Sequence, residues 1–248
     1  MRAILLALVF AGCLTPSLVT IPAGGATGDP PALALSGCQN LSGSFPVLAS
    51  EARELLPAGF QPRSAETSLT SVFWIVSVHC AGSQVDGVET GEAWFSYGEL
   101  DVLAPPAWRQ PGIADYTIPL FALAQPRTIV DALTGLGLPR VALSDTTAET
   151  LPTGGEHIVI GAAGGGFEMV GQPTTGTSTL GDGQWGMFGV SSDRHVVSSI
   201  RGSAMGGTAA SSVLAQTSDG ALPLMAHARP VARGGAVSGF DLSFARVG

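Results

Sequence analysis

Residues 71–103 read SVFWIVSVHCAGSQVDGVETGEAWFSYGELDVL, and this stretch decides the fold class. From Ser71 to Cys80, large apolar residues occupy both alternating faces, which is typical of a strand that is buried on both sides. Asp86-Gly87 is a favoured two-residue hairpin turn, and a second apolar run follows over residues 92–103. The stretch therefore predicts a β-hairpin at the centre of a sheet.

Further strands and two helices are expected around this hairpin. One helix is predicted at residues 45–56, where Ser44 can cap it and Pro46 suits its first turn, and another at residues 126–136, which a proline begins and glycines end. Strands are predicted at residues 116–124, 141–144, 156–162, 167–172, 185–190, 195–200, 222–229 and 239–246. The polar, glycine-bearing residues 174–183 are expected to form a loop. The pattern predicts an α+β fold that is mostly β: a curved antiparallel sheet that closes into a barrel-like core, with two or so outer helices.

The first residues indicate export. Arg2 precedes an apolar run over residues 3–11, which is too short to span a bilayer and is typical of a signal peptide. Phe10-Ala11-Gly12-Cys13 resembles the lipobox of bacterial lipoproteins, where the signal is removed before the cysteine and the thiol is acylated. We predict a signal peptide over residues 1–12, a tether over 13–36 and a single β-rich domain over 37–248, in an extracytoplasmic protein that meets the membrane only through the lipid on Cys13. The alternative is a secreted protein whose signal is cut near residues 23–26, so that Cys13 is removed with it.

The chain has three cysteines, and an exported protein with Cys13 acylated has two left to pair. Extracytoplasmic compartments are oxidising, so Cys38 and Cys80 are predicted to form a disulfide. Two buried free thiols are the alternative.

Charge and composition exclude several classes of function. The net charge of −8 argues against partners with dense negative charge, such as nucleic acid and anionic membrane surfaces. All 11 basic residues are arginine. Without a lysine, the chain cannot form a side-chain Schiff base, a Walker-type phosphate loop or a Ser-x-x-Lys acyl-enzyme.

The histidines do not predict a metal site. The four of them, His79, His157, His195 and His227, are widely spaced along strand-like runs, without the short spacing of a metal-binding pair. We therefore expect no metal and no other cofactor. A hydrolytic triad from Asp193, His195 and a serine remains open, although no motif marks a nucleophile.

Several short motifs resemble the acetoacetate decarboxylase superfamily. They are Leu56-Pro57-Ala58-Gly59-Phe60, Val85-Asp86-Gly87, Trp94-Phe95-Ser96-Tyr97-Gly98-Glu99 and Pro105-Pro106. The resemblance implies a curved, barrel-like sheet around an apolar cavity. In the enzymes of that family, a cavity lysine forms a Schiff base with a keto acid, and a glutamate in a Tyr-x-Glu strand helps to position the substrate. Tyr97-Gly98-Glu99 is similar to that segment, but the lysine has no counterpart, so decarboxylation by the family's route is excluded.

Glu99 is the carboxylate with the clearest functional potential. An acid facing a closed apolar cavity has its pKa raised by desolvation and can donate or accept a proton. The strands around Val76, Phe121 and Ile160 are expected to close over it. The alternative is a solvent-facing strand residue beside Asp101, because alternating strands normally expose their acids.

Three functions of different classes follow. The first is a binding domain that encloses a small apolar or carboxylate-bearing molecule, with Glu99, Tyr97, Phe95, Arg63 and Arg109 as ligand-binding residues. The second is a lysine-independent lyase or hydrolase that uses Glu99 as acid or base and Arg63, Arg109 or Arg127 as anion partner. The third is a structural cell-surface domain without a pocket. The missing lysine favours the binding domain over an enzyme.

Overall fold

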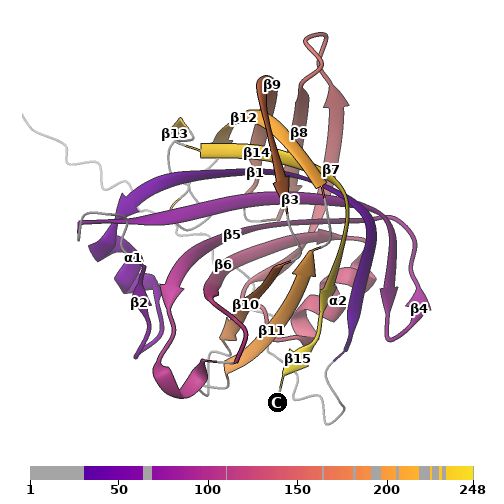
Figure 1. Cartoon of the computed structure of the whole chain (residues 1–248). Coiled ribbons are helices and arrows are strands. Elements are labelled where there is room, and N and C mark those ends of the chain that lie inside the picture. The colour runs from indigo at the N-terminus through magenta and orange to yellow at the C-terminus, as the bar shows by residue number, and fades with distance from the viewer. Residues whose placement is uncertain are drawn as a thin grey trace, which may run out of the picture.

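The computed structural model describes residues 31–63, 69–109, 111–163, 165–180, 183–190, 197–204, 207–217, 224, 229–230 and 233–247. Within these ranges, the chain forms one large mixed sheet of 15 strands together with two α-helices (Figure 1). The mostly β character is thus confirmed. In the described ranges, neither helix has the length and apolar character needed to cross a membrane.

The elements follow one another in a simple order. They are β1 (Leu33–Leu48), α1 (Ala49–Leu55), β2 (Gln61–Pro62), β3 (Thr70–Val85), β4 (Val88–Glu89), β5 (Ala93–Leu103), the 3-10 turn η1 (Pro106–Trp108), β6 (Asp115–Gln125), α2 (Arg127–Gly135), β7 (Val141–Thr150), β8 (Glu156–Ala162), β9 (Phe167–Leu180), β10 (Gly183–Val190), β11 (Val197–Ala204), β12 (Gly207–Thr217), β13 (Arg229–Pro230), β14 (Arg233–Phe244) and β15 (Arg246–Val247).

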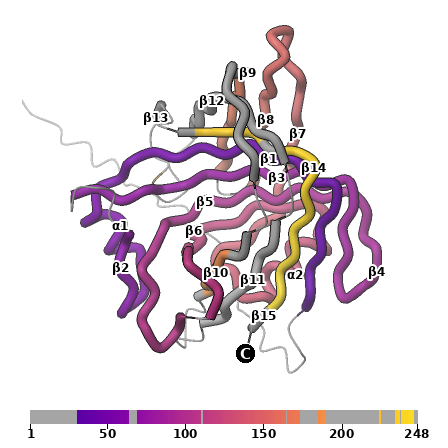
Figure 2. The backbone as a smooth tube through the Cα atoms, viewed as in Figure 1, coloured from indigo at the N-terminus to yellow at the C-terminus, as the bar shows by residue number. Residues whose placement is uncertain are grey.

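The sheet is mixed, which corrects the prediction of an antiparallel one. Its main path runs β13-β12-β9-β8-β7-β6-β10-β11-β14-β1-β3-β5-β2, and β5 also pairs with β6 and β12 with β14. The strand β6 runs parallel to both β7 and β10, because α2 and the longer excursion through β7, β8 and β9 return the chain in the same direction. Figure 2 shows β1, β3, β5 and β6 curving side by side across the molecule.

The predicted central hairpin is present. β3 lies between β1 and β5, and Val76 faces Tyr97 across the β3–β5 ladder. The β3–β4 turn places Asp86 at φ 53° and Gly87 at φ 78°, the left-handed pair that an Asp-Gly turn provides.

The first helix is shorter than predicted. Residues 45–48 continue β1 and pair with β3, so α1 begins only at Ala49. Phe45 and Val47 alternate into the core at 3% and 2% exposure, and this burial outweighs the helix that Ser44 and Pro46 suggested. β1 itself begins at Leu33, inside the segment that was predicted to be a tether.

The predicted loop over residues 174–183 is also wrong up to Leu180. There β9 continues and pairs with β12, which sequence patterns did not reveal. A partner strand satisfies backbone groups regardless of side-chain polarity, so a polar run can be a strand. Most of the strand predicted at residues 222–229 lies outside the described residues.

Two apolar cores lie on opposite faces of β5. We call the core that includes the helix α2 the α2-side core; its members include Phe95, Tyr97, Val76, Ile129, Leu133, Met187 and Leu242. The other core includes Trp94, Leu100, Phe73, Phe121, Ile160 and Phe188. The amphipathic helix α2 buries Ile129, Val130, Ala132 and Leu133 against the sheet.

The disulfide prediction is confirmed. Cys38 and Cys80 are direct partners in the β1–β3 ladder and are joined, with their Cα atoms 4.0 Å apart. Cys13 and the predicted signal peptide lie outside the described residues.

Candidate functional site

A β-bulge in β6 shapes the candidate site. Gly98 pairs with Phe121, whereas the next residue, Glu99, pairs with Pro119, so Leu120 is an extra residue in β6. Proline has no N–H to give to a ladder, and a bulge is one of the places where a strand accepts it. The extra residue shifts the alternation of side chains in β6 by one position. Thr117 therefore pairs with Asp101 and lies on the same face of the sheet.

Gly98 allows the close packing at this bulge. A Cβ added there would lie 2.5 Å from ring atoms of both Phe73 and Phe121. Phe121 also meets Phe167 edge-on, with the ring centroids 6.2 Å apart. The glycine thus lets aromatic side chains press against β5 directly behind Glu99.

Glu99 is buried, with 7% of its surface exposed, and this rules out the solvent-facing alternative. It shares a face of β5 with Tyr97 and Asp101, because side chains alternate along a strand and the β3–β5 register is unbroken. Among the expected covering residues, Val76 lies in the α2-side core with Tyr97. Phe121 and Ile160 lie in the opposite core, so the expectation that they close over Glu99 is wrong.

Two buried side-chain oxygens in the described chain have no hydrogen-bond partner: Oε2 of Glu99 and Oγ1 of Thr117. Thr117 is also 7% exposed. Native structures rarely leave buried polar atoms unsatisfied, and each such atom costs about 1–3 kcal/mol. These two oxygens are neighbours on one face of the sheet, so a single bound molecule could satisfy both.

Burial determines the charge of Glu99. Desolvation raises the pKa of its carboxyl from 4.5 to about 8, and the negative charge of Asp101 adds to the rise. The nearby Thr117 hydroxyl lowers this pKa in part, although its oxygen does not reach hydrogen-bond geometry with the carboxyl. Burial and the charge of Glu99 also raise the pKa of the Tyr97 hydroxyl. Glu99 is therefore mainly neutral at pH 7 and can donate a hydrogen bond.

Several polar and charged residues lie next to Glu99, toward the end of β5. Asp101 accepts a hydrogen bond from the indole N–H of Trp74, at 3.4 Å. Desolvation raises the pKa of Asp101, while the Trp74 hydrogen bond and the charge of Arg63 oppose the rise. Arg63 in turn forms an ion pair with Asp115, at 2.6 Å. Along β5, the α2-side face thus passes from apolar residues to a charged cluster.

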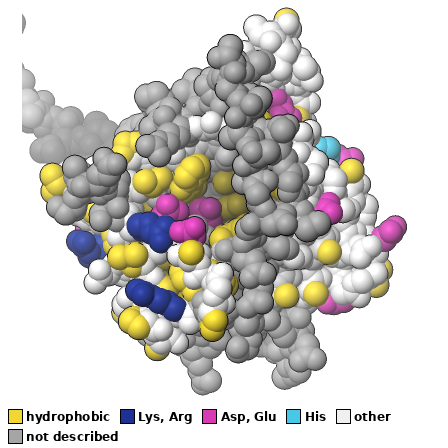
Figure 3. All heavy atoms as spheres, in the orientation of Figure 1, with side chains coloured by type: hydrophobic (Ala, Val, Ile, Leu, Met, Phe, Trp, Pro, Cys, Tyr) yellow, Lys and Arg dark blue, Asp and Glu magenta, His cyan; other side chains and the backbone are white. Residues whose placement is uncertain are grey.

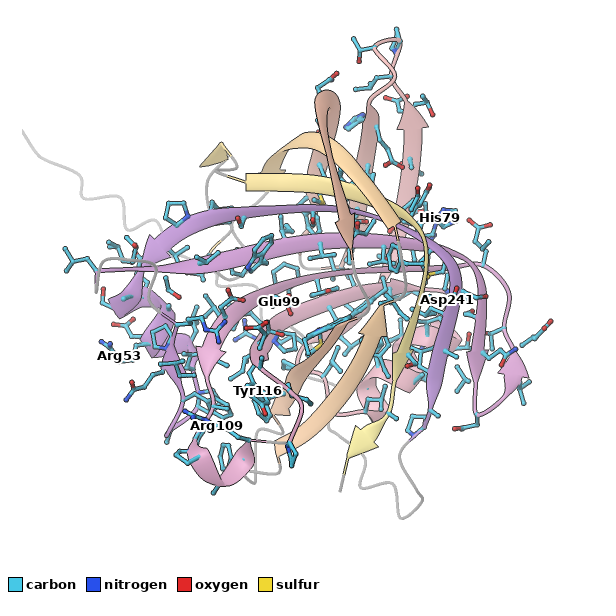
Figure 4. All side chains as sticks on the ribbon, in the orientation of Figure 1. Arg53, His79, Glu99, Arg109, Tyr116 and Asp241 are labelled. Atoms are coloured by element: carbon cyan, nitrogen blue, oxygen red, sulfur yellow. A yellow bond between two sulfur atoms is a disulfide. The ribbon has the colours of Figure 1, made fainter. Side chains whose placement is uncertain are left out.

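The space-filling view shows this arrangement on one face of the molecule. Acidic side chains gather beside an arginine in a recess, with hydrophobic side chains around them (Figure 3). In Figure 4, Glu99 lies near the middle of the curved sheet, whereas Arg53 and Arg109 lie toward its edge. Figures 3 and 4 share one orientation, and Glu99 lies in the part of the molecule where this recess is seen.

The structure separates the predicted ligand-binding residues. It brings Tyr97, Glu99 and Arg63 to one region. Phe95 is 1% exposed and stacks on Tyr97 with ring centroids 4.6 Å apart, which is a packing role. Arg109 is exposed and donates from Nε to the carbonyl of Ala104 at 3.0 Å.

The remaining charged candidates lie elsewhere. Arg127 pairs with Asp131 on the exposed side of α2. His79 bonds to Glu92 at 2.7 Å and stacks on Trp94, and His157 lies between Glu149 and Glu168. The hydrogen bond that the His157 ring donates to the Glu149 carboxylate is the main cause that raises the pKa of His157. No cluster of three or more potential metal ligands occurs in the described ranges, and Asp193, His195 and His227 fall outside them.

Solved structures with the same fold are known. One is an acetoacetate decarboxylase-like enzyme from Sphingomonas wittichii RW1, with 12% identity, a TM-score of 0.59 and coverage of 92% of this chain and 97% of that one. The fold is acetoacetate decarboxylase-like. It extends over about 90% of the chain, as the enduracididine biosynthesis enzyme MppR in complex with pyruvate also shows, with 13% identity, a TM-score of 0.59 and coverage of 90% of this chain and 91% of that one.

An acetoacetate decarboxylase from Legionella pneumophila is also similar, with 10% identity, a TM-score of 0.56 and coverage of 89% of this chain and 88% of that one. No protein-family model and no curated protein matches the sequence. At these identities the likeness establishes the acetoacetate decarboxylase-like fold alone.

Sequence reasoning missed Thr117, Asp115 and Trp74 as site residues. Trp74 was recognised only as a strand residue, although its register partner is Glu99. Thr117 reaches this face only because of the bulge at Leu120. Pro119 within an apolar strand was the available signal for that bulge.

Proposed function

We propose that this chain is an exported, lipid-anchored domain that binds a small molecule at Glu99 without Schiff-base catalysis. The ligand lies within the curved sheet, whose strands close into a barrel-like core around it. The ladders from β6 through β10, β11, β14, β1, β3 and β5 back to β6 support this closure. The ligand class is small and apolar, with a carbonyl, hydroxyl or carboxylate group.

The pair of unsatisfied oxygens carries this proposal. A purely structural core gains nothing from a buried carboxyl and a buried hydroxyl that lack partners, so their presence favours a ligand over a filled core. A protonated Glu99 can donate to a carbonyl or hydroxyl oxygen, and Thr117 can donate or accept. The pyruvate complex of MppR supports the choice of a small carbonyl compound as a first probe.

Lysine-independent catalysis is the second candidate. A carboxyl whose pKa is raised to about 8 can exchange a proton near neutral pH, which is what a general acid or base requires. Arg63 would have to serve as the anion partner, but it is already paired with Asp115. The binding function therefore has the stronger support.

Native mass spectrometry of the purified protein tests the binding function. We expect a bound small molecule in the wild type, lost in Glu99→Leu and retained in Glu51→Gln, a control on the exposed face of α1. Thr117→Val should weaken ligand retention yet stabilise the empty protein, because it removes an unsatisfied buried hydroxyl worth about 1–3 kcal/mol. Pyruvate and acetone are the first probes for ligand-observed NMR. The proposal is overturned if wild type carries no adduct and no small-molecule probe binds to it, including the three described in the next subsection.

A further inference from the structure

Three oxygen acceptors converge on one face of β5 and β6. Asp101 and Thr117 are direct register partners, and Glu99 lies two residues along β5 from Asp101 on the same face. Oε2 of Glu99 and Oγ1 of Thr117 are buried and unpartnered. A carboxylate has about four acceptor positions, so Asp101 keeps free capacity beside its bond from Trp74.

The nearby cation is already engaged. Arg63 donates from one terminal nitrogen to Asp115 at 2.6 Å and from the other to the carbonyl of Ala114 at 3.3 Å. Among the described residues, this arginine lies with the carboxylates of Asp101 and Asp115 and with the carboxyl of Glu99, which is mainly neutral at pH 7. An incoming anion would meet no unpaired cation in this cluster and would be repelled by its acids, so the field favours a positively charged group.

The aromatic and apolar surroundings suit the same group. Trp74 pairs with Glu99 across β3 and β5, and its indole lies beside Asp101. An indole adds cation–π attraction where an ammonium approaches its ring. On the other side of Glu99, Tyr97 and Val76 belong to the α2-side core, so a short aliphatic part would find apolar contacts.

We propose that the ligand carries a primary ammonium group, which donates its three N–H bonds to Glu99, Thr117 and Asp101, and that its remainder is short and aliphatic. This inference rests on the proposed function, since it names the class of molecule that the site binds. It replaces the expected carboxylate with a cation. A primary ammonium has three donors and no acceptor, which matches three oxygens that lack or can spare partners.

Three isosteric probes test the charge of the ligand: n-propylammonium, n-propanol and propionate, each observed by saturation-transfer NMR and titrated against the purified chain. We expect n-propylammonium to bind at least 10-fold more tightly than the other two. Asp101→Asn should weaken this binding about 10-fold, and Arg63→Gln should strengthen it several-fold by removing the opposing charge. Circular dichroism confirms that each variant is folded.

The pH dependence of wild-type binding gives a test without variants. Among the described residues, the charged groups around Glu99 are Asp101, Arg63 and Asp115, and the Tyr97 hydroxyl is a further titratable neighbour. Because the pKa of Glu99 is about 8, its negative charge develops between about pH 7 and about pH 9, while an alkylamine remains protonated. The affinity for n-propylammonium should therefore rise over that interval.

The outcomes separate the two proposals. Preferential binding of propionate or n-propanol, with dependence on Glu99, overturns the ammonium inference and leaves the binding function standing. Equal binding of n-propylammonium by wild type and Asp101→Asn also overturns it. No binding of any probe, together with no adduct in the native protein, removes the proposed function itself.

Discussion

At the scale of the residue, Glu99 should set part of the pH dependence of stability. Its folded pKa of about 8 lies above the ordinary value of 4.5, so between these pH values the folded state binds more protons than the unfolded state. The stabilisation is complete below the unfolded pKa and is lost as the pH rises through the folded pKa. We expect the free energy of unfolding to fall on raising the pH, by at most about 1.4 kcal/mol per unit from this group.

Urea denaturation of wild type and Glu99→Gln at pH 5 to 9 measures this contribution. The side chain of the variant cannot ionise. The free energy of unfolding should therefore fall less from pH 5 to pH 9 in the variant than in wild type. Glu51→Gln, on the exposed face of α1, is the control for the change of side chain. Parallel curves for wild type and Glu99→Gln would contradict the buried neutral acid.

The sequence could single out Glu99 but not its partners. A period of two places Glu99 and Asp101 on one face, yet the period does not say whether that face is covered. Burial follows from the α2-side core, which residues from distant strands complete. Arg63 and Asp115 are 52 positions apart in the sequence. Their ion pair forms because the sheet brings them together, so it could not be predicted from local patterns.

At the scale of the element, the packing at the β6 bulge should tolerate no side chain at Gly98. In Gly98→Ala, the new methyl group would lie 2.5 Å from Phe73 and Phe121, and overpacking of this kind typically costs about 1–3 kcal/mol. Gly161→Ala in β8 is the matched control, because its nearest neighbour atom would be at an ordinary 3.6 Å. Equal stability of the two variants in urea denaturation would contradict this prediction, because it would show that the aromatic rings can move aside at little cost in free energy.

A second prediction concerns the link between β1 and β3. The Cys38–Cys80 disulfide closes a loop with a sequence separation of 42, for which the chain-entropy model gives about 4 kcal/mol. The double variant Cys38→Ser, Cys80→Ser should lose stability on this scale in chemical denaturation. A reducing agent should destabilise wild type and leave the double variant unchanged; an unaffected wild type would contradict a stabilising role.

Elements with strong local patterns were predictable, whereas those defined by a distant partner were not. The Asp86-Gly87 hairpin and α2 carry their signals within a few residues. β12 is rich in small and polar residues, and it is a strand because β9 and β14 pair with it. The first residues of β1 resembled a linker for the same reason: their partners are β3 and β14.

At the scale of the whole molecule, the chain has the acetoacetate decarboxylase-like fold although its sequence contains no lysine. The acetoacetate decarboxylase-like fold persists at 12% identity, because apolar patterning and strand pairing set the architecture and allow wide substitution. A fold does not determine function, so a chain without lysine can have this fold and a different function. The short motifs from Leu56 to Pro106 predicted the acetoacetate decarboxylase-like fold, but the parallel pairings of β6 and the electrostatics of the site required the assembled sheet.

The last prediction concerns how the molecule is held at the membrane. If Cys13 is acylated, wild type should partition into the detergent phase on cell fractionation, and Cys13→Ser should move to the aqueous phase or the medium. Burial of acyl chains contributes about 0.8 kcal/mol per methylene, so the loss of the chains removes the anchor. Ser17→Ala, four residues further on, is the control and should remain with the membrane. Wild type found in the medium with a mature N-terminus near residues 23–26 would instead establish a secreted protein, because Cys13 would then have left with the signal peptide.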